Sequence, residues 1–321
     1  MELKKIYEPV VENLITVTDI LKSIKDVDYP WLAEQLGHIV RGTGKIIRPA
    51  LTLLSGKTFH YNLDHLVPMA VAVELMHTAT LVHDDAIDKA ATRRGQATVN
   101  SIWGDEIAIL IGDYLFARAG EFAADTKTPR AVKLFSHTLG IISSGEINQF
   151  RSSYMTSQTR DDYFRRIYGK TGSLFSLSTQ SGAILGGGSG DDLAIMKNYG
   201  DNLGIAFQIV DDILDFTSTP EKLGKPVGSD LRQGTLTLPS MMVLERYPED
   251  NPVKSFFDSR DEHYTRKAVD MVLNSSIIKE CYAIAAEYRD KGCRGLASLP
   301  ATPSRYSLEL LGEYVINQGK S

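Results

Sequence analysis

Apolar residues recur at intervals of three and four along nearly the whole of this 321-residue chain. That spacing matches the period of the α-helix, and no run shows the alternation of a half-buried strand convincingly. The pattern, with breakers such as Gly42-Thr43-Gly44 between its segments, predicts an all-α fold. The predicted helices cover residues 2–25, 30–41, 45–59, 63–91, 99–124, 128–151, 160–169, 171–186, 190–217, 232–246, 262–275, 278–295 and 303–317.

Composition is compatible with one large helical domain. Hydrophobic residues make up 43% of the chain, enough for a sizeable core. We therefore expect residues 1–321 to form a single-domain bundle of roughly 10–13 helices.

Charge and cysteine content exclude several classes of partner. The net charge of −5 gives no strongly basic face, which argues against nucleic acid. Cys281 and Cys293 lack metal-ligand spacing and are expected to stay reduced, as in the cytoplasm. The N-terminus carries no apolar signal region. Glu74 and His77 interrupt the apolar run at 70–82, and no stretch reaches the roughly 18 apolar residues of a membrane span.

Two aspartate boxes of the form D-D-x-x-D indicate a metal site. The first is Asp84-Asp85-Ala86-Ile87-Asp88, and the second is Asp211-Asp212-Ile213-Leu214-Asp215. Residues four apart share one face of a helix, so Asp84 pairs with Asp88 and Asp211 with Asp215. Such pairs repel unless a cation lies between them. Mg²⁺ binds a few carboxylates together with water and phosphate oxygens, so these four aspartates are the predicted metal ligands of a phosphate site.

The alternative for either box alone is a solvated charged helix face. Both boxes, however, follow apolar pairs, Leu81-Val82 and Ile209-Val210, and each is followed within about a dozen residues by cations. This shared context favours a metal-bridged phosphate site over two solvated faces.

Several cations are placed where they could bind phosphate. Lys45 and Arg48 begin a predicted helix, whose N-terminus attracts anions. Arg93-Arg94 follow the first box, Lys170-Thr171 stand at a helix break, and Lys225 lies in a loop. Each has a structural alternative: cations on an ordinary capped helix, a salt bridge from an arginine to a neighbouring aspartate, a simple turn, and a solvated loop lysine.

Taken together, these motifs resemble the trans-isoprenyl diphosphate synthases, or polyprenyl synthetases. The resemblance covers most of the chain. It is carried by residues 44–49, 81–95, 145–149, 204–215 and 225–239.

The resemblance assigns roles to individual residues. It implies that Asp84, Asp88 and Asp211 hold Mg²⁺ on an allylic diphosphate. The same diphosphate would contact Arg93, Lys170, Thr171, Gln208 and Lys225, whereas isopentenyl diphosphate would bind Lys45, Arg48, His77 and Arg94. The catalytic set so implied is Asp84, Asp85, Asp88, Arg93, Lys170, Gln208, Asp211 and Lys225.

His77 has its own alternative, because a lone histidine on an apolar helix is usually a core residue. It precedes Asp84 by seven residues, two turns away on the same face, which favours the role of ligand.

The reaction implied is condensation of an allylic diphosphate (geranyl, farnesyl or geranylgeranyl) with isopentenyl diphosphate. A central apolar cavity of the bundle would keep water from the carbocation. A homodimer is expected from the family. A terpene cyclase would not need Lys45, Arg48 and Arg94 for a second diphosphate, and a catalytic subunit that requires a second component is a further alternative.

Product length depends on residues upstream of the first box. One helical turn is about 5.4 Å, close to one isoprene unit, so each preceding turn forms a successive floor. Short-chain members place an aromatic residue four or five positions before the first aspartate, where this chain has Thr80 and Ala79, with Met76 a turn further. We therefore predict a product longer than twenty carbons, which Ala79→Phe would shorten; geranylgeranyl diphosphate is the alternative product.

Overall fold

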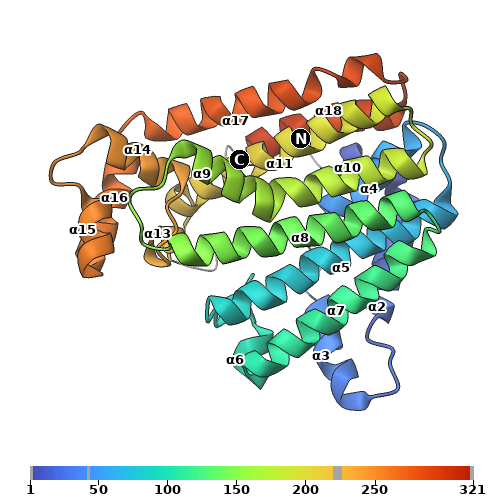
Figure 1. The fold of residues 1–321 in the computed structure, drawn as a ribbon, viewed down its shortest axis with the longest axis horizontal. Coiled ribbons are helices and arrows are strands. Elements are labelled where there is room, and N and C mark those ends of the chain that lie inside the picture. Colours follow the sequence, from blue (N-terminus) through green and yellow to red (C-terminus); the bar gives the residue numbers. More distant parts are fainter. Residues whose placement is uncertain (1–2, 42–43, 220–225, 319–321) are drawn as a thin grey trace. The chain divides into compact units, whose positions relative to one another are not determined.

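The computed structural model describes residues 3–41, 44–219 and 226–318, and within these ranges it is almost entirely helical (Figure 1). The predicted all-α class is confirmed. The chain groups into two compact units. Unit 1 comprises Met1–Leu139, Leu174–Gly200 and Gly295–Leu311, and unit 2 comprises Gly140–Ser173, Asp201–Arg294 and Gly312–Ser321. That residues 1–321 form one domain stays a prediction.

Unit 1 contains the helices of the first third of the chain and segments of four later ones. Its own elements are α1 (Leu3–Tyr7), η1 (Glu8–Val10), α2 (Val11–Ser23), α3 (Pro30–Val40), α4 (Ile47–Lys57), α5 (Leu63–Ile87), β1 (Thr92–Arg93), β2 (Gln96–Ala97), α6 (Val99–Trp103), α7 (Asp105–Asp125) and η3 (Leu296–Ser298). The helices α8 (Pro129–Ser152), α10 (Ser173–Leu185), α11 (Gly190–Thr217) and α18 (Pro303–Asn317) contribute residues to both units.

Helix α5 forms the core of unit 1. It lies alongside α7 (Figure 1) and also packs against α2 and α4. Asn62 caps its N-terminus by accepting the N–H of Asp64 at 3.1 Å. Met69, Met76 and most residues between them are fully buried, so the helix is apolar on nearly every side. By length and hydropathy α5 could cross a membrane, but 56% of its apolar window is buried inside the protein, as in a core helix.

Close contact between α5 and α7 depends on Gly112. A Cβ atom at this position would lie 2.1 Å from the imidazole of His83. The ring occupies that space, and its Nε2 lies 2.9 Å from the carbonyl oxygen of Ile109. His83 thereby fixes the last turns of α5, which carry the first aspartate box, against α7.

A short hairpin follows α5, and the sequence pattern did not predict it. Its strands β1 and β2 have two residues each, too few to show alternation. Arg94 and Gly95 form the turn with φ values of 51° and 75°, the left-handed conformation of a type I′ turn. The hairpin begins soon after Ile87, where α5 ends instead of continuing to residue 91.

Unit 2 contains α9 (Arg160–Ile167), the π-helix η2 (Tyr168–Gly172), α13 (Ser229–Arg232), α14 (Leu238–Arg246), α15 (Pro252–Ser259), α16 (Glu262–Leu273) and α17 (Ile277–Cys293). Helix α15 was not predicted, because its apolar residues Val253, Phe256 and Phe257 span less than two turns. Pro9 and Gly104 divide two of the helices predicted as continuous.

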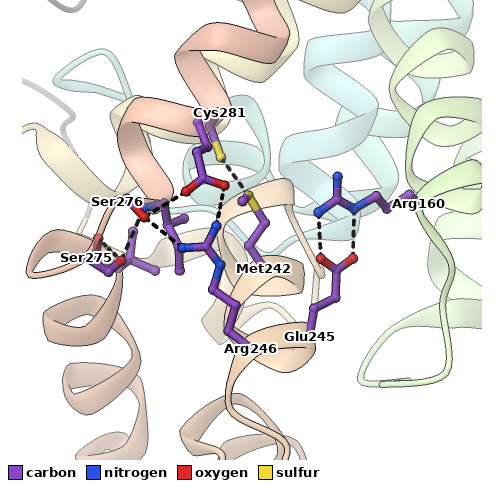
Figure 2. A network of polar contacts seen from close by, with 10 residues as sticks. Arg160, Met242, Glu245, Arg246, Ser275, Ser276 and Cys281 are labelled. Atoms are coloured by element: carbon purple, nitrogen blue, oxygen red, sulfur yellow. Dashed lines mark hydrogen bonds and ion pairs between the residues drawn. The ribbon is translucent and has the colours of Figure 1, made fainter.

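Helix α14 is joined to its neighbours by adjacent charged residues (Figure 2). Glu245 accepts two hydrogen bonds from Arg160 of α9, at 2.8 and 2.6 Å. Arg246 pairs with Glu280 of α17 and donates to Ser276 at 2.9 Å. Between these pairs, the sulfur atoms of Met242 and Cys281 are 3.6 Å apart. The bidentate geometry and the buried sulfur contact fix α9, α14 and α17 together.

We predict that Gly182→Ala destabilises the fold, because its Cβ would lie 2.3 Å from the carbonyl oxygen of Thr52 and 2.8 Å from Cβ of Ser55. Overpacking against a helix backbone costs about 1–3 kcal/mol of unfolding free energy, measurable by urea denaturation. Gly140→Ala in α8 is the control, because nothing lies within 4 Å of its Cβ; it should stabilise by about 0.4–1 kcal/mol. Equal stability of the two variants would contradict the packing argument.

Candidate active site

The first aspartate box lies at the C-terminal end of α5 in unit 1. Asp84 is half-buried, Asp88 is exposed and Asp85 is only 7% exposed. The Asp85 carboxylate accepts the Nε–H of Arg93 with 2.9 Å to each oxygen, and Nη2 of Arg93 lies 2.9 Å away as well. The box therefore faces two ways: Asp85 inward to Arg93, and Asp84 and Asp88 toward accessible surface.

The pKa values of both partners of this ion pair are raised. Burial raises the pKa of Asp85 and the charge of Asp84 adds to the rise, while Arg93 acts against it. Burial alone would lower the pKa of Arg93, but Asp85, Asp84 and Asp88 together raise it. The salt bridge considered as an alternative for the arginine pair is thus present at Arg93. Its predicted contact with the allylic diphosphate, and the catalytic role of Asp85, stay predictions.

The second box lies on α11 in unit 2 and has a similar division. Asp211 is exposed, whereas Asp212 and Asp215 are each 2% exposed. Asp212 accepts the Tyr163 hydroxyl at 2.7 Å and Nε2 of Gln208 at 2.9 Å. Burial raises the pKa of Asp212 to about 8, and the charge of Asp230 adds to this rise. In both boxes, therefore, the second aspartate points into the protein.

Asp215 differs from its counterpart Asp88 in the first box. Its Oδ2 accepts the backbone N–H of Asp230 at 3.2 Å, and its carbonyl oxygen accepts the N–H of Gly228 at 2.9 Å. Asp215 thus anchors the segment before α13, and its role as a metal ligand stays a prediction.

The accessible carboxylates suit a hard divalent cation. Asp84, Asp88 and Asp211 offer oxygen ligands at accessible positions, and Mg²⁺ needs only a few carboxylates besides water and phosphate. Among residues 3–41, 44–219 and 226–318, no three His, Cys, Asp or Glu side chains are grouped so as to hold a metal by themselves.

A cavity of about 320 Å³ in unit 1 is lined by two of the four residues predicted to bind the second diphosphate, His77 and Arg94. Its polar wall includes Gly44, His77, Arg93 and Arg94, and the rest is largely aliphatic. The Arg94 guanidinium lies against Gly44, where a Cβ atom would be 2.4 Å from Nη1. The hairpin thus places Arg94 beside the residue that precedes Lys45.

Lys45 and Arg48 are positioned near this cavity by other contacts. The carbonyl oxygen of Lys45 accepts the Tyr7 hydroxyl at 2.8 Å. The Arg48 guanidinium lies 5.2 Å from the ring centroid of Phe175, within cation–π distance.

Glu74 is a half-buried acidic residue in the cavity wall that the sequence reasoning missed. Burial raises its pKa, whereas Arg48 and Arg94 act to lower it. Its Oε2 is buried without a hydrogen-bond partner among the described residues. The signal is visible in the sequence, because a glutamate three residues before His77 interrupts the apolar run. That interruption argues equally against a membrane span, so on its own it does not identify a site residue.

His77 is held in its neutral form. Burial, followed by the charges of Arg48, Arg94 and Arg93, lowers its pKa well below 6.5. A neutral imidazole retains one N–H donor and one acceptor. His77 can thus donate a hydrogen bond to an anion in a wall that already carries arginines.

The remaining predicted ligands lie in unit 2. Lys170 and Thr171 belong to the π-helix η2, a type of distortion common at functional sites. Lys170 Nζ is 3.0 Å from Oε1 of Glu146, and the Thr171 hydroxyl donates to Oε1 of Gln208 at 2.6 Å. Lys225 lies outside the described residues.

Comparison with known proteins supports one family. The polyprenyl synthetase family model matches residues 29–273. The chain is 36% identical to heptaprenyl diphosphate synthase component 2 of Geobacillus stearothermophilus over 98% of both chains. It is also 36% identical to the chloroplastic solanesyl-diphosphate synthase 2 of Oryza sativa subsp. japonica, over 98% of this chain and 79% of that protein.

A solved structure has the same fold. The polyprenyl synthase of Caulobacter crescentus CB15, complexed with calcium and isoprenyl diphosphate, is 30% identical and superimposes with a TM-score of 0.92. The superposition covers 98% of this chain and 97% of that one.

The lowered pKa of His77 predicts a specific dependence of stability on pH. The unfolded chain protonates this histidine near 6.5, while the folded protein does so only at lower pH. The stability present above pH 6.5 is therefore lost as pH falls, by up to about 1.4 kcal/mol per pH unit. Urea unfolding at about pH 7.5 and about pH 5.5 should show a smaller acid loss in His77→Gln than in the wild type. His137→Gln, on the exposed surface of α8, is the control, and it should match the wild type; an equal loss in His77→Gln would refute the assignment.

Proposed function

Because the chain belongs to the polyprenyl synthetase family, and is therefore a prenyltransferase, we propose that it condenses an allylic diphosphate with isopentenyl diphosphate. The product is an all-trans polyprenyl diphosphate longer than twenty carbons. The observation that carries the proposal is the division of both aspartate boxes, each of which buries its second carboxylate and leaves acidic oxygens accessible on a helix.

Isopentenyl diphosphate binds at the cavity of unit 1 in this proposal. Lys45, Arg48 and Arg94 supply positive charge, and the neutral His77 supplies a hydrogen bond without further charge repulsion among the cations. Leu75, Leu81 and other aliphatic side chains offer an apolar surface to the isopentenyl group. A second diphosphate site of this kind favours condensation over cyclisation of one substrate.

The allylic diphosphate is assigned to the accessible side of α11 and to η2. Lys170 supplies a cation, and Thr171 and Gln208 supply polar groups already linked to each other. Arg93 and Lys225 complete the predicted set. Fixed donors of this kind stabilise charge as it develops on a leaving diphosphate.

Magnesium is the proposed cofactor. Asp84, Asp88 and Asp211 would hold it, with Asp215 as a further predicted ligand, and the bound ions would neutralise the departing diphosphate. Carboxylate chemistry supports this choice. The Caulobacter crescentus structure, complexed with calcium, supports a divalent cation more generally.

The other steps depend on position and on the exclusion of water. Cations on both substrates orient them so that the isopentenyl double bond attacks the allylic carbon. Aliphatic walls keep water from the carbocation, and the proton is lost to the released diphosphate.

A long product is supported by the relatives and by the residues before the first box. The two relatives described above are heptaprenyl and solanesyl synthases. No aromatic side chain occurs at Met76, Ala79 or Thr80. A geranylgeranyl product is less favoured.

Assembly is also part of the proposal. We expect a homodimer, and the exposed Ile109 and Leu110 of α7 support burial of that helix by another chain. The Geobacillus stearothermophilus relative is named as a component, so a heterologous second subunit is the competing arrangement. A cytoplasmic location is proposed as well, supported by two cysteines that form no disulfide.

The reaction is tested by incubating the purified chain with farnesyl diphosphate, radiolabelled isopentenyl diphosphate and Mg²⁺. Chromatography of the dephosphorylated products should show chains longer than twenty carbons, and EDTA should abolish them. Asp84→Ala serves as an inactive reference. Absence of elongation by the chain alone would contradict the self-sufficient enzyme and favour a subunit that needs a partner.

Thr80→Phe should shorten the product. Thr80 is half-buried, so an aromatic ring can enter neighbouring space, whereas Ala79 is 0% exposed and Ala79→Phe should also lower the thermal midpoint. Thr80→Val is the control, because it keeps the size and removes only the hydroxyl that donates to the carbonyl of His77 at 2.7 Å. An unchanged product length in both phenylalanine variants would contradict the proposal that these positions limit the growing prenyl chain.

A further inference from the structure

A partly buried series of hydrogen bonds in unit 2 ends at two residues of the predicted allylic site, Gln208 and Thr171. It starts at the Tyr163 hydroxyl, which donates to Oδ2 of Asp212 at 2.7 Å. Oδ1 of Asp212 accepts Nε2 of Gln208 at 2.9 Å, and Oε1 of Gln208 accepts the Thr171 hydroxyl at 2.6 Å. Tyr163 is 0% exposed and has no assigned role in the predicted site.

This series of hydrogen bonds determines which way the Gln208 amide faces. A glutamine amide can turn over and exchange its oxygen and nitrogen. With Asp212 ionised, or with a proton shared between Tyr163 and Oδ2, Oδ1 of Asp212 accepts, so the nitrogen of Gln208 faces Asp212. The amide oxygen then faces Thr171.

This orientation directs the second N–H of Gln208 toward the metal-binding side of the helix. Its nitrogen is 3.4 Å from Oδ2 of Asp211, a long distance for a hydrogen bond. A diphosphate oxygen next to Asp211 would be a better acceptor for that N–H, because it is charged.

The position of Tyr163 is itself fixed from two sides. The Arg166 guanidinium lies 5.6 Å from its ring centroid, and the ring of Phe164 packs edge-on at 5.2 Å. Its helix, α9, is joined to α14 by Arg160 and Glu245 (Figure 2). Tyr163 is thus a rigid donor that holds Asp212 in a single orientation.

We propose that Tyr163 and Asp212 are positioning residues for the allylic substrate, acting through the orientation of the Gln208 amide and the Thr171 hydroxyl. This inference rests on the proposed function, because it concerns how that site recognises one of its two diphosphates. It gives the second aspartate of the second box a task other than binding metal.

Tyr163→Phe tests the proposal by removing one hydroxyl that does not touch the substrate. The KM for farnesyl diphosphate should rise about tenfold, as expected for one weakened hydrogen bond to a charged group, while the KM for isopentenyl diphosphate stays within about twofold. Tyr199→Phe is the matched control. Its hydroxyl is also buried and donates to the carbonyl of Leu308 at 2.6 Å in unit 1, so its loss should leave both KM values unchanged.

A double-mutant cycle separates positioning from general destabilisation. In a Gln208→Ala background, Tyr163→Phe should have no further effect on the KM for farnesyl diphosphate, because the group it orients is gone. If the effect persists undiminished, or if both KM values rise together, the proposal is overturned.

A second pair of variants and a binding measurement provide two further tests. If Tyr163→Phe does not fold, Asp212→Leu should raise the KM for farnesyl diphosphate more than Asp212→Asn, whose amide can still accept from Gln208; the reverse order overturns the proposal. Binding of farnesyl diphosphate with Mg²⁺ is also followed by calorimetry. A wild type that neither binds nor elongates it refutes the proposed function itself, whereas equal binding by the wild type and Tyr163→Phe refutes only the positioning role.

Discussion

Successive residues of an α-helix point about 100° apart, so the second aspartate of a D-D-x-x-D box is turned away from the first. The first and third aspartates, four residues apart, share a face. When such a box ends a helix that is buried on most sides, one carboxylate must enter the protein and needs a partner there. Arg93 meets that need for Asp85, and Tyr163 with Gln208 meets it for Asp212. The local arrangement of both predicted sites follows from these two partnerships.

Much of the candidate site could be predicted because its signals are local. The shared face of Asp84 and Asp88 and the position of His77 two turns before Asp84 both follow from helical spacing. The partners of the buried aspartates were harder to predict. Arg93 was considered as a salt-bridge donor because it lies eight residues from Asp85, but Tyr163 is 49 residues from Asp212, and no spacing rule connects them.

In the fold, too, features set by local sequence were predictable, and features that depend on distant residues were not. Long periodic helices such as α5 and α11 were predicted with small errors at their ends. Short features were predicted less well: the hairpin and the eight-residue helix α15 were missed, and the π-helix η2 lies where a helix break was predicted. Their stability comes from tertiary packing, which a periodic pattern does not report. At η2, for example, a Cβ atom added to Gly145 would lie 3.5 Å from Cα of Gly169.

The left-handed backbone of Arg94 gives the hairpin an evolutionary cost. A non-glycine residue in this conformation is less stable than glycine or asparagine would be at the same turn. Selection for stability alone would replace the arginine, yet the tight turn is what places its guanidinium beside Gly44. Position 94 is therefore one where stability and function oppose each other. A descendant that lost its substrate should lose this arginine early, while keeping the turn.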